Sequence, residues 1–420
     1  MTVSDVVELE GHIIDSGLME RAFTVVMDLG GEFDIEEFEV GTTKTAESYC
    51  RMRVIAPDED TLYPILHELH QSGATLASPA DAELTPAPAD NVVPHGFYST
   101  TNHPTDVRID GEWIGVEDIE MDCAVVVEGV ERGEDGTVVV DGEPDVRAET
   151  KVLNGIEAGD LVVTGDAGIR VKPPERPRDS SGPFGFMQGG VSAERPSKSL
   201  IRDIAEAIAE TKAQGGRVLC VAGPAVIHAG GGPGLARLVR EGYVDAISAG
   251  NGFAVHDMER SRYGTSLGMD VETMEHPRKG HKHHIYTISE VIRAGGIEAA
   301  VEEGLVTEGV MYECVSNDRD FVLAGSIRDD GPLPDTITDA VEAQHAIREQ
   351  AREADLVLML SSLLHSVAVG NCLPSTTRTV CVDINPATVT QLLDRGSAQA
   401  VGMVTDVGTF VPLLAEELLE

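Results

Sequence analysis

The chain has 420 residues, with 72 acidic and 31 basic side chains and a formal net charge of −41. This charge excludes binding to nucleic-acid phosphates or anionic membranes by electrostatic attraction, and 4% aromatic residues exclude a base-stacking platform. The acids are spread along the whole chain, as is typical of cytoplasmic proteins of halophilic archaea, and the length predicts two or three domains.

Residues 1–90 are expected to form a small ferredoxin-like α/β domain. Strands are predicted over residues 6–14, 32–40 and 48–56, and helices over 16–29 and 61–72. The resulting β-α-β-β-α order is typical of a ferredoxin-like sandwich. The proline-rich stretch 85–90 is predicted to be a linker.

Residues 91–190 are expected to form a β-rich domain on the substrate side, with a linker. Asp110-Gly111 lies between two short apolar runs and predicts a hairpin over residues 106–115. Further strands are expected over 123–130, 137–140 and 161–164. The stretch 173–196 is rich in Pro, Gly and Ser, and is either a linker or a loop over the active site.

Residues 191–420 are expected to form a Rossmann-like domain with a doubly wound parallel sheet. Short apolar runs without alternation are typical of parallel strands covered on both faces. Such runs occupy residues 217–222, 244–248, 354–360, 379–384 and 399–404, and helices are predicted over 197–214, 235–241, 285–294, 298–304 and 407–419.

Polar residues follow several of these strands. In doubly wound sheets ligands bind outside the carboxyl ends of the strands, where an acid can hold the ribose hydroxyls of a dinucleotide. Asp383 follows one strand, Asn251 another, and the turn 361–365 a third, so we expect half of a dinucleotide site here. The alternatives are that Asp383 is a helix cap and Asn251 a turn former.

Three other motifs have open interpretations. The glycine-rich run 228–234 is either a phosphate loop or a structural turn, and the loop 326–334 is either a lid over the ligand or a solvated turn. His281, His283 and His284 lack metal-ligand spacing, so we predict no metal and favour proton transfer by one of them.

The cysteines and the hydropathy pattern indicate in which cellular compartment the protein is expected. The six cysteines show no CxxC spacing and are expected to be buried thiols rather than disulfides or zinc ligands. No leader sequence is predicted, and no apolar run reaches the ~18 residues of a membrane span. We therefore expect a cytoplasmic protein.

The chain resembles a known family in several blocks. His95–Thr105 reads HGFYSTTNHPT; Gly111–Trp113, Ile119–Asp122 and Asp15–Phe33 also match. These blocks resemble the lysine-oxoglutarate reductase/saccharopine dehydrogenase conserved-domain family, and within it the archaeal-type ornithine cyclodeaminases. The resemblance spans nearly the whole chain and implies conversion of L-ornithine to L-proline and ammonia with NAD⁺, a step in arginine and ornithine metabolism and proline biosynthesis.

The resemblance also implies a set of NAD contacts at the strand ends. The family has Thr-Met-Leu-His where this chain has Ser362-Leu363-Leu364-His365, a mild change if backbone or hydroxyl groups make the contact. The implied contacts are Asn251, Gly252, Asp330, Ser362, Leu363, Leu364, His365, Asp383, Met403 and Val404.

The implied reaction removes hydride from the ornithine α-carbon, closes the ring through the δ-amine with loss of ammonia, and returns the hydride. It requires an acid/base, for which Glu120, Asp122 and His284 are candidates, and a cation for the carboxylate, for which Arg108 and Arg262 are candidates. A homo-oligomer is expected. Two alternatives remain: an NAD-dependent amino-acid or saccharopine-type dehydrogenase, and a non-catalytic protein that senses NAD or an amino acid.

Overall fold

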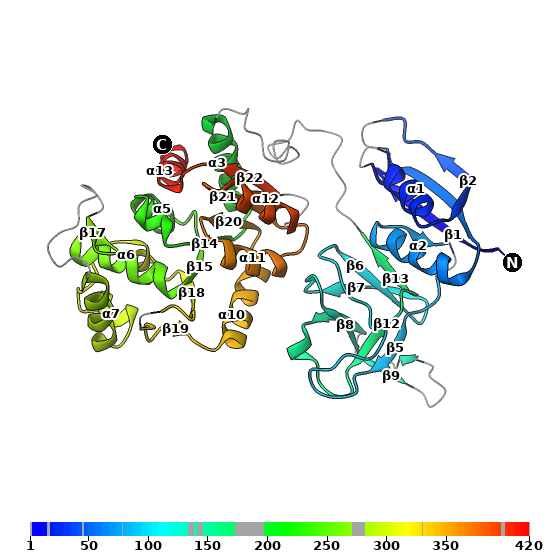
Figure 1. The fold of residues 1–420 in the computed structure, drawn as a ribbon, viewed down its shortest axis with the longest axis horizontal. Coiled ribbons are helices and arrows are strands. Elements are labelled where there is room, and N and C mark those ends of the chain that lie inside the picture. The colour runs from blue at the N-terminus through cyan, green and yellow to red at the C-terminus, as the bar shows by residue number, and fades with distance from the viewer. Residues whose placement is uncertain are drawn as a thin grey trace. The chain divides into compact units, whose positions relative to one another are not determined.

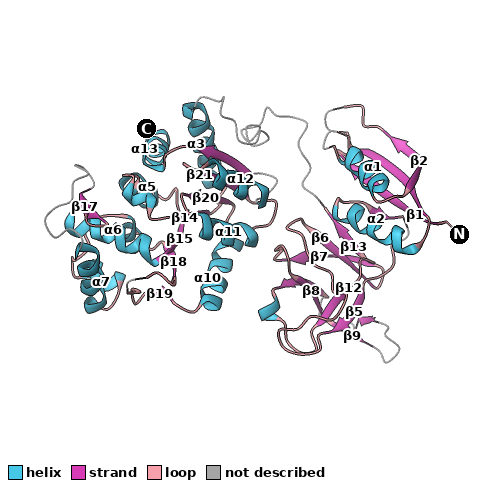
Figure 2. Ribbon diagram, viewed as in Figure 1, coloured by secondary structure: helices cyan, strands magenta, loops and turns pink. Residues whose placement is uncertain are grey.

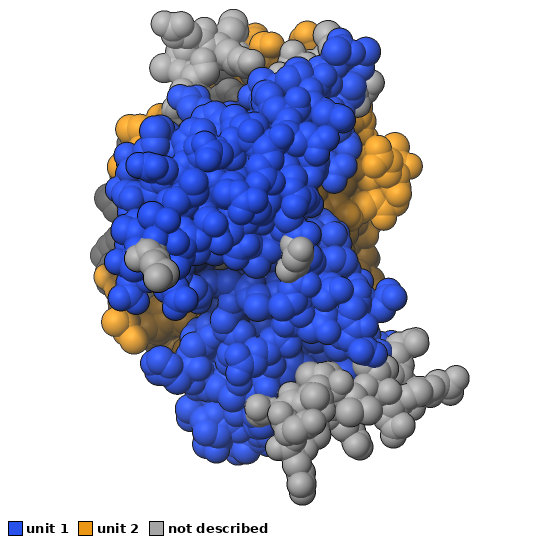
Figure 3. Space-filling view, turned by 90° about the vertical axis from the view of Figure 1, so that its right-hand side faces the viewer, with its two compact units in different colours: residues 1–180, 374–376 blue, residues 181–373, 377–420 orange. Residues whose placement is uncertain are grey.

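The computed structural model describes residues 2–14, 17–43, 46–77, 79–132, 138–140, 146–172, 197–270, 282–329, 331–395 and 400–419. The chain divides into two compact units, which Figure 3 colours separately. Unit 1 comprises residues 1–180 with 374–376, and unit 2 comprises residues 181–373 with 377–420. The finer division into domains 1–90, 91–190 and 191–420 stays a proposal.

The first module of unit 1 has the predicted ferredoxin-like topology. Its sheet has the strand order β2-β3-β1-β4, with β1 antiparallel to both of its neighbours. The sequence missed β4, because two residues are too few for a periodic signal. The elements are β1 (Val3–Gly11), α1 (Leu18–Asp28), β2 (Glu32–Glu39), β3 (Ser48–Ala56), α2 (Glu59–Gln71) and β4 (Thr75–Leu76).

The second module of unit 1 is the predicted β-rich region. Among the described residues it contains a sheet of order β13-β6-β7-β11-β8-β12-β5. The predicted hairpin is present: Asp110 (φ 48°) and Gly111 (φ 82°) join β6 to β7 in the left-handed conformation that a two-residue turn requires. The strands are β5 (Glu83–Pro86), β6 (Thr105–Ile109), β7 (Glu112–Glu117), β8 (Ala124–Glu128), β9 (Val130–Arg132), β10 (Val138–Val140), β11 (Arg147–Lys151), β12 (Leu161–Thr164) and β13 (Ile169–Val171).

The linker predicted over residues 85–90 is wrong at its beginning. Thr85 and Pro86 belong to β5, which pairs with β12 in the register Leu161 to Pro86. A proline is tolerated there because β5 is an edge strand and needs no amide on its outer side. The second predicted linker, residues 173–196, lies outside the described residues.

Unit 2 is built on the predicted parallel sheet (Figure 1). Among the described residues the strand order is β19-β18-β15-β14-β20-β21-β22, and every pairing in this sheet is parallel. This confirms the Rossmann-like, doubly wound expectation. The strands are β14 (Val218–Ala222), β15 (Ala246–Gly250), β18 (Asp320–Ala324), β19 (Thr336–Ile337), β20 (Leu356–Leu360), β21 (Arg378–Asp383) and β22 (Ala400–Val404).

Helices cover both faces of this sheet, as Figure 2 shows. Successive residues of one strand enter opposite cores: Cys220 and Leu358 pack with α5, α6 and α13, whereas Leu219 and Val357 pack with α10 and α11. This two-sided burial explains why the strands read as continuous apolar runs. The helices are α3 (Ser197–Ala213), α4 (Ala225–His228), α5 (Gly232–Arg240), α6 (Asn251–Tyr263), α7 (His283–Ala294), α8 (Ile297–Glu302), α9 (Val310–Ser316), α10 (Ala340–Arg352), α11 (Leu363–Cys372), α12 (Pro386–Arg395) and α13 (Val407–Leu419).

The direction of chain progression reverses between β14 and β20. From β14 the chain proceeds through β15 and β18 to β19, and it then returns to β20 on the other side of β14. The two strand ends come very close: a Cβ on Gly223 would lie 2.0 Å from the Ser361 carbonyl oxygen, so only glycine fits. Ser361 itself has a left-handed φ of 48°. Such a reversal forms the ligand crevice of doubly wound sheets.

The glycine-rich run 228–234 supports helix packing. A Cβ on Gly234 would lie 3.1 Å from Val411 of α13, so this glycine allows α5 and α13 to approach. Gly408 allows a second close approach, because its Cβ would lie 1.9 Å from the Ala229 carbonyl oxygen. Of the two interpretations left open, the structure favours the structural turn.

All six cysteines are buried free thiols, as predicted. Among the described residues, no helix combines the length and apolarity that a membrane crossing requires.

Candidate active site

The predicted strand-end residues of unit 2 gather at one edge of the sheet. The parallel pairing places Gly250, Leu360, Asp383 and Val404 at the carboxyl ends of β15, β20, β21 and β22. The turns and helix starts that follow these strands therefore form one surface. We call it the sheet edge.

The side chain of Asn251, at this edge, already makes hydrogen bonds within the protein. It is 3% exposed and is the first residue of α6, because β15 ends later than predicted, at Gly250. Its Oδ1 accepts hydrogen bonds from the Leu333 amide (3.0 Å) and the Thr336 hydroxyl (2.9 Å). The Asn251 side chain thus holds the loop before β19.

His365 of α11 lies close to the carboxyl end of β15. Its Cε1 would be 3.2 Å from a Cβ on Gly250, so the ring of an α11 residue covers the end of β15. Burial lowers the pKa of His365, and the charge of Asp329 partly opposes this shift. The imidazole is therefore neutral at neutral pH and can accept or donate one hydrogen bond.

The start of α11 presents backbone amides at the sheet edge. Ser362 is the N-cap, and its side chain makes no capping hydrogen bond, so the hydroxyl is not used by the helix. The next two residues are unusually exposed for their type, Leu363 at 40% and Leu364 at 81%. A helix start with unsatisfied N–H groups attracts phosphate.

Asp383 ends β21 and is half-buried rather than turned into the core. Its Oδ1 accepts a hydrogen bond from the Asn385 amide (2.8 Å) in the turn before α12. The cap of α12 is Asn385, whose Oδ1 accepts from the Ala387 amide (3.0 Å), so Asp383 is not the helix cap that was one alternative. No second bond to this carboxylate is found within the described residues, so it retains acceptor capacity for another group.

The remaining predicted contacts differ in exposure. Met403 is 5% exposed and packs in the core, whereas Val404 is 41% exposed at the end of β22. Gly252 lies in the first turn of α6, where a Cβ would be 3.8 Å from Pro224. Asp330 lies outside the described residues. All of these assignments to the cofactor stay predictions.

A cluster of histidines comes from the end of α4, the middle of α6 and the start of α7. It lies near the hairpin of β16 (Thr265–Ser266) and β17 (Met269–Asp270). The ring centroids of His228 and His256 are 4.7 Å apart, and those of His256 and His284 are 5.5 Å apart. His228 shares a 2.6 Å hydrogen bond with the Ser266 hydroxyl. We call His228, His256 and His284 the histidine cluster.

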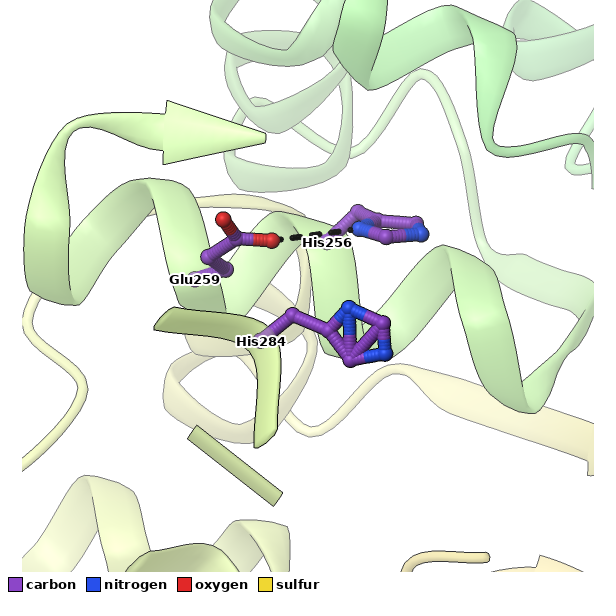
Figure 4. Close-up of side chains that lie close together, drawn as sticks. All are labelled: His256, Glu259 and His284. Carbon is purple, nitrogen blue, oxygen red and sulfur yellow. Dashed lines mark hydrogen bonds and ion pairs between the residues drawn. The ribbon is translucent and has the colours of Figure 1, made fainter. Parts of the chain in front are cut away.

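Glu259 is the buried carboxylate that organises this cluster (Figure 4). Its Oε1 accepts from the Thr265 hydroxyl and the Gly268 amide, both at 2.8 Å. Its Oε2 accepts from the Leu267 amide at 3.0 Å and from His256 Nδ1 at 3.3 Å. Burial would raise the pKa of Glu259, but these hydrogen bonds, that from His256 foremost, outweigh burial and lower it.

The ionised Glu259 determines the tautomer of His256. A carboxylate only accepts, so Nδ1 of His256 carries the proton and Nε2 is the basic nitrogen in the neutral ring. A carboxylate that orients an imidazole in this way is a common arrangement for proton transfer.

The same groups have the donor types of a metal site. His256, Glu259 and His284 each place one ligand atom within 4.8 Å of the others. Both Glu259 oxygens, however, already accept two hydrogen bonds each, which leaves this carboxylate poorly suited as a ligand. The arrangement favours proton transfer over metal binding, and the absence of a metal stays a prediction.

The other predicted catalytic residues belong to unit 1. Glu120 is 5% exposed, and its carbonyl accepts a hydrogen bond from the Thr100 hydroxyl. Asp122 is exposed and has a left-handed φ of 61°. The third candidate, His284, belongs to unit 2 and contacts His256.

Both arginines proposed to bind a carboxylate already have acidic partners. Arg108 Nη1 lies 2.8 Å from Asp81, and Arg262 Nε lies 3.1 Å from Glu290. Each would have to exchange that partner for a substrate.

Sequence reasoning missed His228, His256 and Glu259. A signal was present, because His256 and Glu259 are three residues apart and therefore share a helix face. The helix itself, α6, was not predicted: it is buried nearly all round and lacks an amphipathic pattern.

Models of known protein families match three consecutive segments of the chain. A family model described as the Rossmann-fold C-terminal region of ArgZ-like arginine dihydrolases matches residues 202–414, and its first region matches 104–201. The conserved region of the bifunctional LOR/SDH enzyme matches residues 4–103.

Similar proteins cover nearly the whole chain. An ornithine cyclodeaminase of Methanopyrus kandleri is 53% identical over 99% of this chain and 97% of its own length. The crystal structure of apo ArgZ, a cyanobacterial arginine dihydrolase, has 40% identity and a TM-score of 0.82 over 100% of this chain. That of the ternary complex of AgrE with ornithine and NAD⁺ has 41% identity and a TM-score of 0.52 over 99%. This chain spans 58% of the ArgZ chain and 57% of the AgrE chain.

The doubly wound sheet, its open edge and the adjoining carboxylate-oriented histidine define a nucleotide-binding α/β enzyme. More specifically, the chain belongs to the family that joins archaeal ornithine cyclodeaminases with the C-terminal part of ArgZ-like proteins.

His228 should make the folded chain less stable in mild acid. Burial, and next to it the nearby His256, lowers the pKa of His228 to about 4, from an unfolded value of 6.5. As pH falls through this window the unfolded chain binds a proton that the folded chain refuses, so stability is lost between about pH 6.5 and 4. His228→Asn lacks this titrating group. Between pH 7 and 4.5 its free energy of unfolding should therefore rise by about 2 kcal/mol relative to that of wild type.

Urea unfolding followed by circular dichroism at several pH values measures this difference. Ser266→Ala is the matched control, because it removes the same hydrogen bond and keeps the imidazole, so its pH dependence should follow wild type. A difference between His228→Asn and wild type that is constant with pH would contradict the prediction.

Proposed function

We propose that this enzyme converts L-ornithine to L-proline and ammonia with NAD as a catalytic cofactor. The single observation that carries the proposal is the sheet edge. There the exposed start of α11 follows β20, and the half-buried Asp383 lies at the end of the adjacent parallel strand β21. The ornithine cyclodeaminase of M. kandleri and the AgrE complex with ornithine and NAD⁺ support it. We further propose a cytoplasmic protein of a halophilic archaeon, acting in proline biosynthesis. The homo-oligomer remains a prediction.

The residues at the sheet edge fit a dinucleotide. The amides at the start of α11 would hold the pyrophosphate, and Gly223 leaves room at the crevice because no side chain fills it. Asp383, on the next strand, would accept the ribose hydroxyls with its remaining acceptor capacity. β21 and β14 lie on opposite sides of β20. A dinucleotide whose ribose is bound at Asp383 would therefore extend toward β14 and toward His228, which follows β14 in the chain.

The histidine cluster supplies the proton chemistry in this proposal. When bound, NAD accepts and later returns a hydride. Nε2 of His256 would take a proton from the ornithine α-ammonium group, and Glu259 would stabilise the imidazolium that results. His284, at 5.5 Å from His256, would return a proton to the departing ammonia. The low pKa of His228 keeps that ring neutral, so it adds no charge that would repel the substrate ammonium.

Two rival functions remain. An NAD-dependent amino-acid or saccharopine-type dehydrogenase would use the same sheet edge and would release NADH. A non-catalytic sensor of NAD or an amino acid would need the edge but not an oriented base, so the Glu259–His256 pair disfavours it.

Labelled ornithine tests the proposed reaction. Incubation with NAD⁺ in concentrated salt should convert ornithine labelled with ¹⁵N at the δ-nitrogen to labelled proline, and ornithine labelled at the α-nitrogen to labelled ammonium, without net NADH. Net NADH accumulation would instead establish a dehydrogenase, and binding of NAD⁺ without any turnover would establish a sensor.

Asp383→Asn should weaken NAD⁺ binding. Loss of charge-assisted hydrogen bonds to a ribose costs about 1.5–3 kcal/mol, so Kd should rise at least about tenfold in a calorimetric titration. Asp320→Asn is the matched control. It removes the same charge from the amino end of a strand of the same sheet, β18, whereas Asp383 lies at the carboxyl end of its strand. Equal Kd values for the two variants would refute ribose binding by Asp383.

His256→Gln should lower kcat by about 10²-fold or more, with the Kd for NAD⁺ unchanged, since the variant removes a base and leaves the sheet edge intact. The control is His345→Gln, an exposed histidine on α10. Steady-state proline formation measures both variants. A wild-type kcat in His256→Gln would rule out this base.

A further inference from the structure

A pocket in unit 1 is lined by none of the residues assigned above. Its volume is about 460 Å³, within the range of about 300–1,000 Å³ that is typical of small-molecule sites. Tyr63 and His67 of α2 line one side of it, and Phe97, Tyr98 and Asp166 of the β-rich module line the other. We call it the α2 pocket.

Aromatic rings are concentrated in the α2 pocket. They make up three of its eleven lining residues, whereas Phe, Trp and Tyr are only 4% of the chain. Tyr63 is 57% exposed, which is unusual for so large a ring in an aromatic-poor protein. Aromatic faces attract cations and the apolar chains that carry them.

Asp166 provides an unused acceptor in the pocket wall. It lies in the turn between β12 and β13, flanked by the left-handed glycines Gly165 and Gly168. Its Oδ1 is 3.0 Å from His67 Nδ1, whereas its buried Oδ2 accepts no hydrogen bond within the described residues. The Asp166 side chain is only 12% exposed, and a buried acceptor without a donor is costly.

The position of Tyr63 is consistent with an anionic Asp166. Burial, followed by a side-chain hydrogen bond to Asp166 and by the negative charge of this carboxylate, raises the pKa of Tyr63 to about 12. Tyr63 and His67 are one helical turn apart, so both face the same carboxylate from α2.

The charge of the pocket selects the ligand. Its eleven lining residues include Glu68 and Asp166 and no lysine or arginine, so an anion would meet two carboxylates without a strong cation to balance them. A ligand that carries an ammonium group on a short apolar chain satisfies both the acid and the rings.

We propose that the α2 pocket binds a small aliphatic amine, with its ammonium group donating to Asp166 Oδ2 and its methylenes packed against Tyr63, Phe97 and Tyr98. All residues that line this pocket belong to unit 1, and none of them belongs to the sheet edge or the histidine cluster.

Calorimetric titration of the full chain with putrescine tests the proposal, and butanediol serves as the uncharged probe of the same length. Wild type should bind putrescine and not butanediol, and Asp166→Asn should raise the Kd for putrescine at least about tenfold, as expected for loss of one charge-assisted bond. Asp34→Asn is the matched control, because it removes the same charge from an exposed position in β2. Its Kd should equal that of wild type.

Tyr63→Leu provides a second variant if Asp166→Asn does not fold. It keeps an apolar side chain at an exposed position and removes the ring, so it should also weaken putrescine binding. No binding to wild type, equal affinities for putrescine and butanediol, or unchanged affinity in a folded Asp166→Asn or Tyr63→Leu variant would each overturn the proposal.

Discussion

Strands β14 and β20 lie side by side at the centre of the parallel sheet, and the chain leaves them toward opposite edges. Their ends approach until Gly223 contacts the carbonyl of Ser361, a distance that no side chain allows. The loops that follow then diverge, one toward α4 and His228, the other toward α11 and His365. The crevice between them, and with it the proposed cofactor site, depends on this single backbone contact.

The second organising element is the buried carboxylate of Glu259. Three of its four hydrogen bonds hold the β16–β17 hairpin, and the fourth orients His256. Because the acid is fully paired, it remains ionised despite burial and contributes a fixed negative charge next to the base. A structural role and a chemical role therefore coincide in one side chain, which explains why an ionised group is retained in the interior.

Local patterns anticipated much of the fold. The apolar runs near residues 356–360 and 378–383 were recognisable because both faces of these strands are buried, and α13 was predicted over the residues it occupies. Asp110-Gly111 indicated its hairpin through turn chemistry alone. The misses have physical causes: β5 contains a proline that only an edge strand tolerates, and α6 has no polar face.

The sequence by itself determined the class of sheet and the residues at the strand ends, because burial on both faces and the polar residues after each strand are local properties of the chain. It also suggested His284 as one candidate for proton transfer, which stays a prediction. Tertiary packing was needed to show that His256 has both His228 and His284 as neighbours, that Asn251 is bonded to a loop, and that Asp166 lines a pocket with Tyr63. These contacts join residues distant in sequence, and their geometry depends on how helices pack across the sheets, which no local pattern encodes.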